Sequence, residues 1–177
     1  MKRTVLTAYC AVVTILWGGC NRATSTQAVD STHGVDSALT VEQLLANPRG
    51  HTHAVVKVRG CLYRGFEILV LFPCRSQSRT ESIWLEDAET EHAFTTFNRL
   101  HPEHKVLPVT ELCFQFDEAR NARAWKKLNA SLKDNIASDV VLVGQFETGR
   151  SGYGHMGGYM HELILVDVLD NKSNPTP

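Results

Sequence analysis

The sequence predicts a mainly β fold with two helices, arranged as an OB-like five-stranded barrel. Five segments alternate apolar and polar residues, or carry runs of β-branched residues, as strands do. A helix predicted within residues 117–136 separates the third of these segments from the fourth, and a short helix precedes the first. An open antiparallel α+β sheet with both helices on one face has the same order of elements and is the alternative.

The first elements are a short helix and a hairpin. Thr40 can cap a helix over residues 41–46, because its side chain can accept a hydrogen bond from the first turn. A strand begins at Ala54, and four of its residues share one face: Val56, Val58, Gly60 and Leu62. Gly65 marks the turn into a second strand over residues 66–72, which is apolar on both faces and so predicts cover from both sides.

A third strand and the main helix follow. Residues 83–86 form a short strand, and residues 88–117 are treated as an insertion that is partly helical over residues 91–100. Asp117 can cap a helix whose apolar positions recur at helical spacing: Ala122, Trp125, Leu128, Leu132 and Ile136. We expect this helix to pack through Trp125.

The last two strands are the most strongly β-branched or apolar segments. Residues 139–146 and 160–169 form them, and a glycine-dense connection over residues 149–158 separates them. With these strands, residues 39–170 make one OB-like domain.

The first twenty residues have the layout of a secretory signal peptide. Lys2 and Arg3 form a basic start, a largely apolar run follows, and two glycines precede Cys20. The stretch Leu16–Cys20 is similar to a bacterial lipobox, in which the cysteine is acylated, as by palmitate, and becomes the mature N-terminus. Asn21 takes the place of an aspartate that would resemble an inner-membrane retention signal. We therefore expect an envelope lipoprotein, attached by its lipid to the outer rather than the inner membrane.

Polar segments flank the domain. Residues 21–38 are rich in Ser, Thr, Asp and small residues, so they are predicted to be a flexible tether between the anchor and the domain. Residues 171–177 are predicted to be a disordered tail.

The cysteine count predicts one disulfide. Cys10 leaves with the signal and Cys20 carries the lipid, so Cys61, Cys74 and Cys113 remain for the domain. Cys61 and Cys74 flank the predicted hairpin and are the favoured pair, with Cys74 and Cys113 as the alternative.

Scattered short segments carry a family resemblance over residues 40–169. They are Leu44–Pro48, Val56, Val58, Gly60, Leu62, Leu71–Pro73, Ile83–Leu85, Val143–Phe146, Gly154–Gly157 and Tyr159. On these residues the chain resembles a group of uncharacterised bacterial envelope proteins and predicted lipoproteins with an OB-like domain. The long segment 88–117 and His51–His53 depart from the pattern of that group. The resemblance implies the fold and no particular activity.

A ligand-binding face is predicted by analogy with other OB folds, which bind across strands two and three and the flanking loops. The candidate ligand-binding residues are Tyr63, Phe66, Trp84, Tyr153, His155 and Tyr159. The whole chain contains 18 Lys and Arg residues and 19 Asp and Glu residues, so it lacks the basic excess that nucleic-acid binding requires. We expect an envelope protein, peptide or oligosaccharide as the partner, and no nucleic acid.

The alternative function is metal binding in the periplasm by the His- and Met-rich loop 153–161. Its candidate ligands are His155, Met156, Met160 and His161, a set that suits copper or zinc. A purely structural role of the loop is favoured, in which the glycines allow a tight turn and the histidine hydrogen-bonds to the backbone. No cofactor is therefore expected. No nucleophile motif such as Gly-x-Ser-x-Gly occurs, so we expect a non-enzymatic binding module.

Overall fold

The computed structural model describes four stretches of the chain: residues 37–76, 81–104, 109–154 and 157–169. The predicted signal peptide with Cys20, the predicted tail and the tether up to residue 36 lie outside these stretches. His155 and Met156 lie outside them too. No helix within the four stretches is both long enough and apolar enough to cross a membrane.

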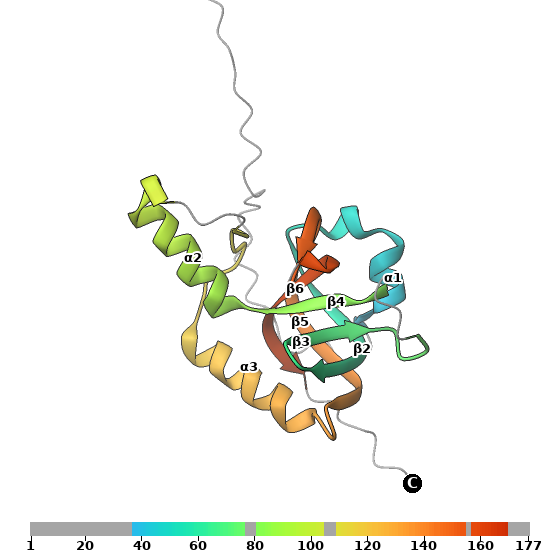
Figure 1. The fold of residues 1–177 in the computed structure, drawn as a ribbon. Coiled ribbons are helices and arrows are strands. Elements are labelled where there is room, and N and C mark those ends of the chain that lie inside the picture. Colours follow the sequence, from blue (N-terminus) through green and yellow to red (C-terminus); the bar gives the residue numbers. More distant parts are fainter. Residues whose placement is uncertain (1–36, 77–80, 105–108, 155–156, 170–177) are drawn as a thin grey trace, which may run out of the picture.

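Five strands form a closed barrel (Figure 1). They are β2 (Ala54–Gly65), β3 (Ile68–Phe72), β4 (Ile83–Asp87), β5 (Ile136–Tyr153) and β6 (Tyr159–Leu169). Their spatial order is β2-β3-β4-β6-β5, and β5 pairs again with β2. Neighbouring strands are antiparallel except β4 and β6, which run parallel. The predicted OB-like barrel is confirmed, because the pairing of β5 with β2 closes the sheet that the alternative leaves open.

The barrel interior holds the main apolar core. All four β2 residues predicted to share a face are buried: Val56, Val58, Gly60 and Leu62. A Cβ atom on Gly60 would lie 2.8 Å from Cγ2 of Val41 and 2.9 Å from the carbonyl oxygen of Phe72. Glycine at this position therefore lets a helix approach the strand closely.

That helix is α1 (Val41–Ala46), which covers the core with Val41 and Leu44. Thr40 caps it as predicted: the Gln43 amide donates to the Thr40 hydroxyl at 3.2 Å, and the Thr40 amide donates to the Gln43 side chain at 2.8 Å. This reciprocal capping box fixes the first turn of a helix too short to be stable alone. Next to it, β1 (Leu39–Thr40) pairs in parallel with β2, and η2 (Pro48–His51) leads into β2.

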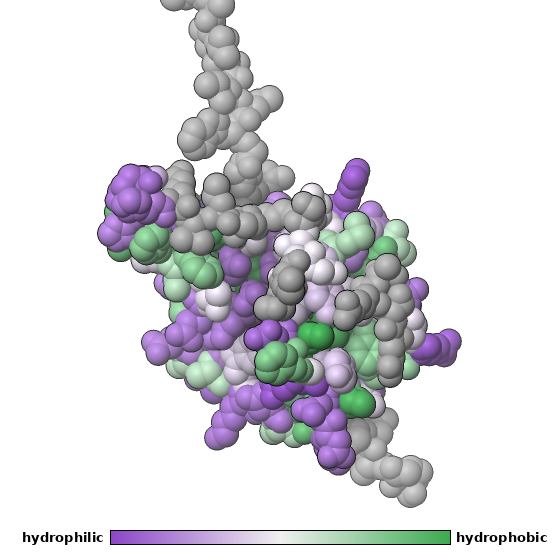
Figure 2. Space-filling view, viewed as in Figure 1, coloured by the Kyte–Doolittle hydropathy of each residue, from purple (hydrophilic) through white to green (hydrophobic). Residues whose placement is uncertain are grey.

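Two further helices lie on one side of the barrel, between β4 and β5 (Figure 1). The insertion contributes α2 (Ala88–Leu100), a complete helix that begins before the predicted residue 91 because Asp87 caps it; the Glu89 amide donates to its carboxylate at 2.9 Å. The described residues therefore hold three α-helices, one more than the two predicted. Figure 2, seen from the same side as Figure 1, shows hydrophilic and apolar side chains interspersed over the surface.

The main helix, α3 (Glu118–Ser131), starts at its predicted cap Asp117, and its buried face matches the predicted stripe only in part. Asn121, Ala124 and Leu128 are buried, whereas Ala122 is exposed. The predicted stripe is wrong at its ends, because the chain turns extended at Leu132 and Ile136 already begins β5. Trp125 packs partly buried against the core, as expected.

The β5–β6 hairpin is longer than the sequence predicts. β5 continues from the predicted end at residue 146 to Tyr153, and Tyr153 pairs with Tyr159 at the start of β6. Gly149 and Gly152 both have a φ of +94°, within an irregular stretch of the ladder. These glycines bend the hairpin and do not end it, so the predicted connection 149–158 is wrong in its first five residues.

Buried side chains hold the segment after α2 on the outside of β5. Gln145, fully buried, accepts a hydrogen bond from the Cys113 amide at 2.6 Å and donates to the carbonyl oxygen of Glu111 at 2.9 Å. It also donates to the carboxylate of Glu147, which lies 2.9 Å from Nδ1 of His53. One strand face thus anchors both the insertion and the start of β2.

Candidate functional site

A second apolar cluster lies apart from the main core and identifies the outer face of the barrel that carries the candidate site. Its buried members come from β2, β3 and the β5–β6 hairpin: Cys61, Val70, Phe72, Tyr153 and Tyr159. Ile68 and Trp84 pack against it partly buried. The cluster exists because the extended hairpin brings Tyr153 and Tyr159 over strands whose two faces are both apolar, as the sequence predicts for residues 66–72.

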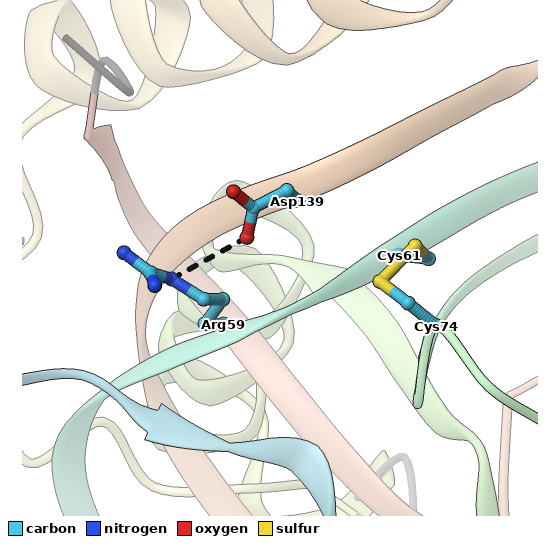
Figure 3. The surroundings of a disulfide bond; sticks show 4 residues. All are labelled: Arg59, Cys61, Cys74 and Asp139. Carbon is cyan, nitrogen blue, oxygen red and sulfur yellow. Dashed lines mark ion pairs between the residues drawn. A yellow bond between two sulfur atoms is a disulfide. The ribbon is translucent and has the colours of Figure 1, made fainter. Parts of the chain in front are cut away.

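A disulfide stabilises this face of the barrel, because one of its cysteines belongs to the cluster. Cys61 and Cys74 are joined, the pair that the sequence favours, and the half-buried Cys113 takes no part in the disulfide. Figure 3 shows the disulfide beside an ion pair that links β2 to β5, in which Nε of Arg59 lies 3.4 Å from the carboxylate of Asp139. The bond fixes the chain after β3 to the middle of β2.

A cavity of about 670 Å³ opens beside this cluster. The β2–β3 turn lines it with Gly65 and Glu67, β4 with Trp84, and the β5–β6 hairpin with Tyr153 and Gly154. OB folds bind their ligands at this place, between the loop that joins the first two strands and the loop that joins the last two. Its volume is in the range of small-molecule and peptide-side-chain pockets.

Trp84 is the central aromatic residue of the cavity wall. Its ring centroid lies 5.3 Å from that of Tyr159, and its indole N–H donates to the carboxylate of Glu86 at 3.0 Å. Gly154 covers the indole closely: a Cβ atom there would lie 2.4 Å from Cδ2 of the ring, and the residue has a φ of +69°. Glycine is required at this position by both the contact and the conformation.

The predicted ligand-binding residues divide into three groups. Trp84 and Tyr153 line the cavity, and Tyr159 is buried behind Trp84. Tyr63 is 41% exposed and Phe66 is 89% exposed, and neither belongs to the cavity lining. His155 lies outside the described residues.

Four carboxylates at the cavity were not predicted: Glu67, Glu86, Glu91 and Glu162. Glu91 and Glu162 are buried, with 8% and 4% of their surface exposed, and the Thr110 amide donates to Glu91 at 2.8 Å. One signal was available for Glu86, which alternates with Leu85 and so shares the outer face of its strand with Trp84. Glu91 lies on α2, in the segment whose path the sequence did not reveal.

The predicted metal ligands are not brought together in the described residues. Met160 is 65% exposed, while its neighbour His161 stacks at 5.7 Å on Phe146 and lies 2.9 Å from the Thr148 hydroxyl. Burial lowers the pKa of His161 below 6.5 by desolvation. Within the described stretches, no group of three or more His, Cys, Asp or Glu side chains could hold a metal ion.

Comparison of the chain with models of protein families, with curated proteins and with solved structures found no match in any of the three. The geometry of the barrel face is therefore the basis for a functional assignment.

Proposed function

We propose that the protein is a membrane-anchored envelope lipoprotein whose OB-like domain binds a ligand, without catalysis, in the cavity between the two hairpins. The single observation that supports binding is the position of this cavity, at the face where OB folds take ligands. Its wall combines an apolar part, at Trp84 and Tyr153, with polar groups that can orient a ligand. The predicted lipobox at Cys20 supports the anchor.

Intrinsic fluorescence gives a local test of binding. Among Trp17, Trp84 and Trp125, the last two belong to the domain, so Trp125→Phe leaves Trp84 as the reporter at the cavity once the signal is removed. The lipoprotein, purified in detergent, is titrated with tetralysine, tetraglutamate and the neutral oligosaccharide chitotetraose. A saturable change with any of the three supports the binding function, and no saturable change with any of them contradicts it.

The reciprocal variant is the matched control. Trp84→Phe keeps Trp125, which packs against the main core and is not part of the cavity lining. The same titration should leave its emission unchanged. A response of equal size from both proteins would show that the ligand acts elsewhere.

The anchor needs its own experiment. In cells, Cys20→Ala should move the protein from the membrane fraction to the soluble fraction and abolish palmitate labelling. Retention of the variant in membranes would refute lipid anchoring.

The alternative of a metal-binding protein has less support, because Met160 and His161 are adjacent in β6 and adjacent strand residues point to opposite faces. Native mass spectrometry tests it: a bound copper or zinc ion that is lost in His155→Ala/Met156→Leu would replace the present proposal.

A further inference from the structure

The charge of the cavity defines the class of its ligand. Among the described residues that line it are four carboxylates, from Glu67, Glu86, Glu91 and Glu162, and one cationic side chain, Arg64. Glu91 and Glu162 are buried, whereas Glu67, Glu86 and Arg64 are at least partly exposed, so the accessible part of the lining has two carboxylates and one guanidinium. An anionic ligand would meet like charge at short range, which costs affinity and slows encounter.

Arg64 does not offset this excess by closing over the carboxylates. Its guanidinium donates to the side-chain carbonyl of Asn129 on α3, which is not part of the cavity lining. Glu86 is held in place by the Trp84 indole N–H and by the Asp87 amide, one on each carboxylate oxygen. An ionised carboxylate has about four acceptor positions, so each oxygen of Glu86 keeps one for a donor from a ligand.

The aromatic wall favours the same class of ligand. Trp84 and Tyr153 line the cavity together with the carboxylates. An ammonium or guanidinium group is attracted to the face of an aromatic ring, and its alkyl stem packs on apolar surface. Neutral sugars also stack on aromatic rings, but they gain nothing from excess negative charge.

We propose that the cavity binds a cationic side chain, lysine or arginine, of a basic peptide segment, with Trp84 as its wall and Glu67 and Glu86 as its acceptors. This inference rests on the proposed binding function and narrows its ligand. Glu67 is exposed in the β2–β3 turn and lines the cavity, so an entering chain can reach it.

The Trp125→Phe lipoprotein again supplies the test, by titration of Trp84 fluorescence. Tetralysine should bind saturably, tetraglutamate should not bind, and chitotetraose should bind more weakly than tetralysine. Raising the salt concentration from 50 to 300 mM should weaken tetralysine binding, because screening acts on exposed charges.

A pair of charge-matched variants removes the nonspecific effect of net charge. Glu67→Gln should weaken tetralysine binding about three-fold, the range of one partly exposed ion pair. Glu42→Gln removes the same charge from an exposed position on α1, outside the cavity lining, and should leave the affinity unchanged. Equal weakening by both variants would overturn the proposal.

The remaining outcomes separate the two proposals. Saturable binding of chitotetraose or tetraglutamate without tetralysine refutes the cationic ligand and leaves the binding function standing. No response to any of the three refutes both.

Discussion

Loss of the Cys61–Cys74 disulfide should destabilise the domain by about 3 kcal/mol. The bond joins residues thirteen positions apart. A cross-link that closes a loop of this length lowers the entropy of the unfolded chain by an amount worth about 3 kcal/mol at 25 °C. Cys61→Ala/Cys74→Ala removes the cross-link and only small side chains, of which the one at Cys61 is buried in the second apolar cluster.

Urea denaturation, followed by Trp125 and Trp84 fluorescence, measures the free energy of unfolding of both proteins. Dithiothreitol should lower the stability of the wild type by nearly the same amount and leave the double variant unchanged, since Cys113 is not disulfide-bonded. A loss below 1 kcal/mol, or a double variant that is destabilised by the reductant, would refute the reasoning.

Three other perturbations probe the site and its support. Gly154→Ala should shift Trp84 emission in the Trp125→Phe background more than Gly149→Ala does, because both positions have a positive φ but no atom lies within 4 Å of a Cβ at Gly149; equal shifts would contradict the contact. Gln145→Leu should lower the free energy of unfolding by ~2–3 kcal/mol in urea, because it leaves buried polar groups unpaired; a neutral change would contradict this. Since burial lowers the pKa of His161, the unfolded chain binds its proton first, and stability should fall as the pH drops below 6.5. His161→Gln should reduce that fall, measured by urea denaturation at pH 7 and pH 5, and an unchanged fall would refute the assignment.

Much of the barrel could be predicted from local sequence. Alternation in β2 identified its buried face correctly, and capping by Thr40 and Asp117 identified two helix starts. These signals act over a few residues, so they survive without knowledge of the partner elements. The buried face of α3 was predicted only in part, because it depends on where the helix ends, and no glycine or proline marks that end before Ile136.

The site was only partly predictable for a different reason. Trp84 and Tyr153 were found because OB folds place their ligands on that face, but the analogy gave no reason to select acidic residues. Glu91 lies at the cavity because α2 carries it there. Glu162 lies there because the parallel pairing of β4 with β6 places it opposite Trp84. Contacts of this kind join residues far apart in the chain, so periodicity and spacing do not reveal them.

Mapping of amide NMR shifts during a tetralysine titration tests most directly whether the cavity between the hairpins is the binding site. We predict saturable shifts concentrated in Gly65–Leu69, Trp84–Glu86 and Gly152–Gly154. Shifts centred instead on α2, where Phe94, Phe97 and Leu100 are exposed, would contradict it.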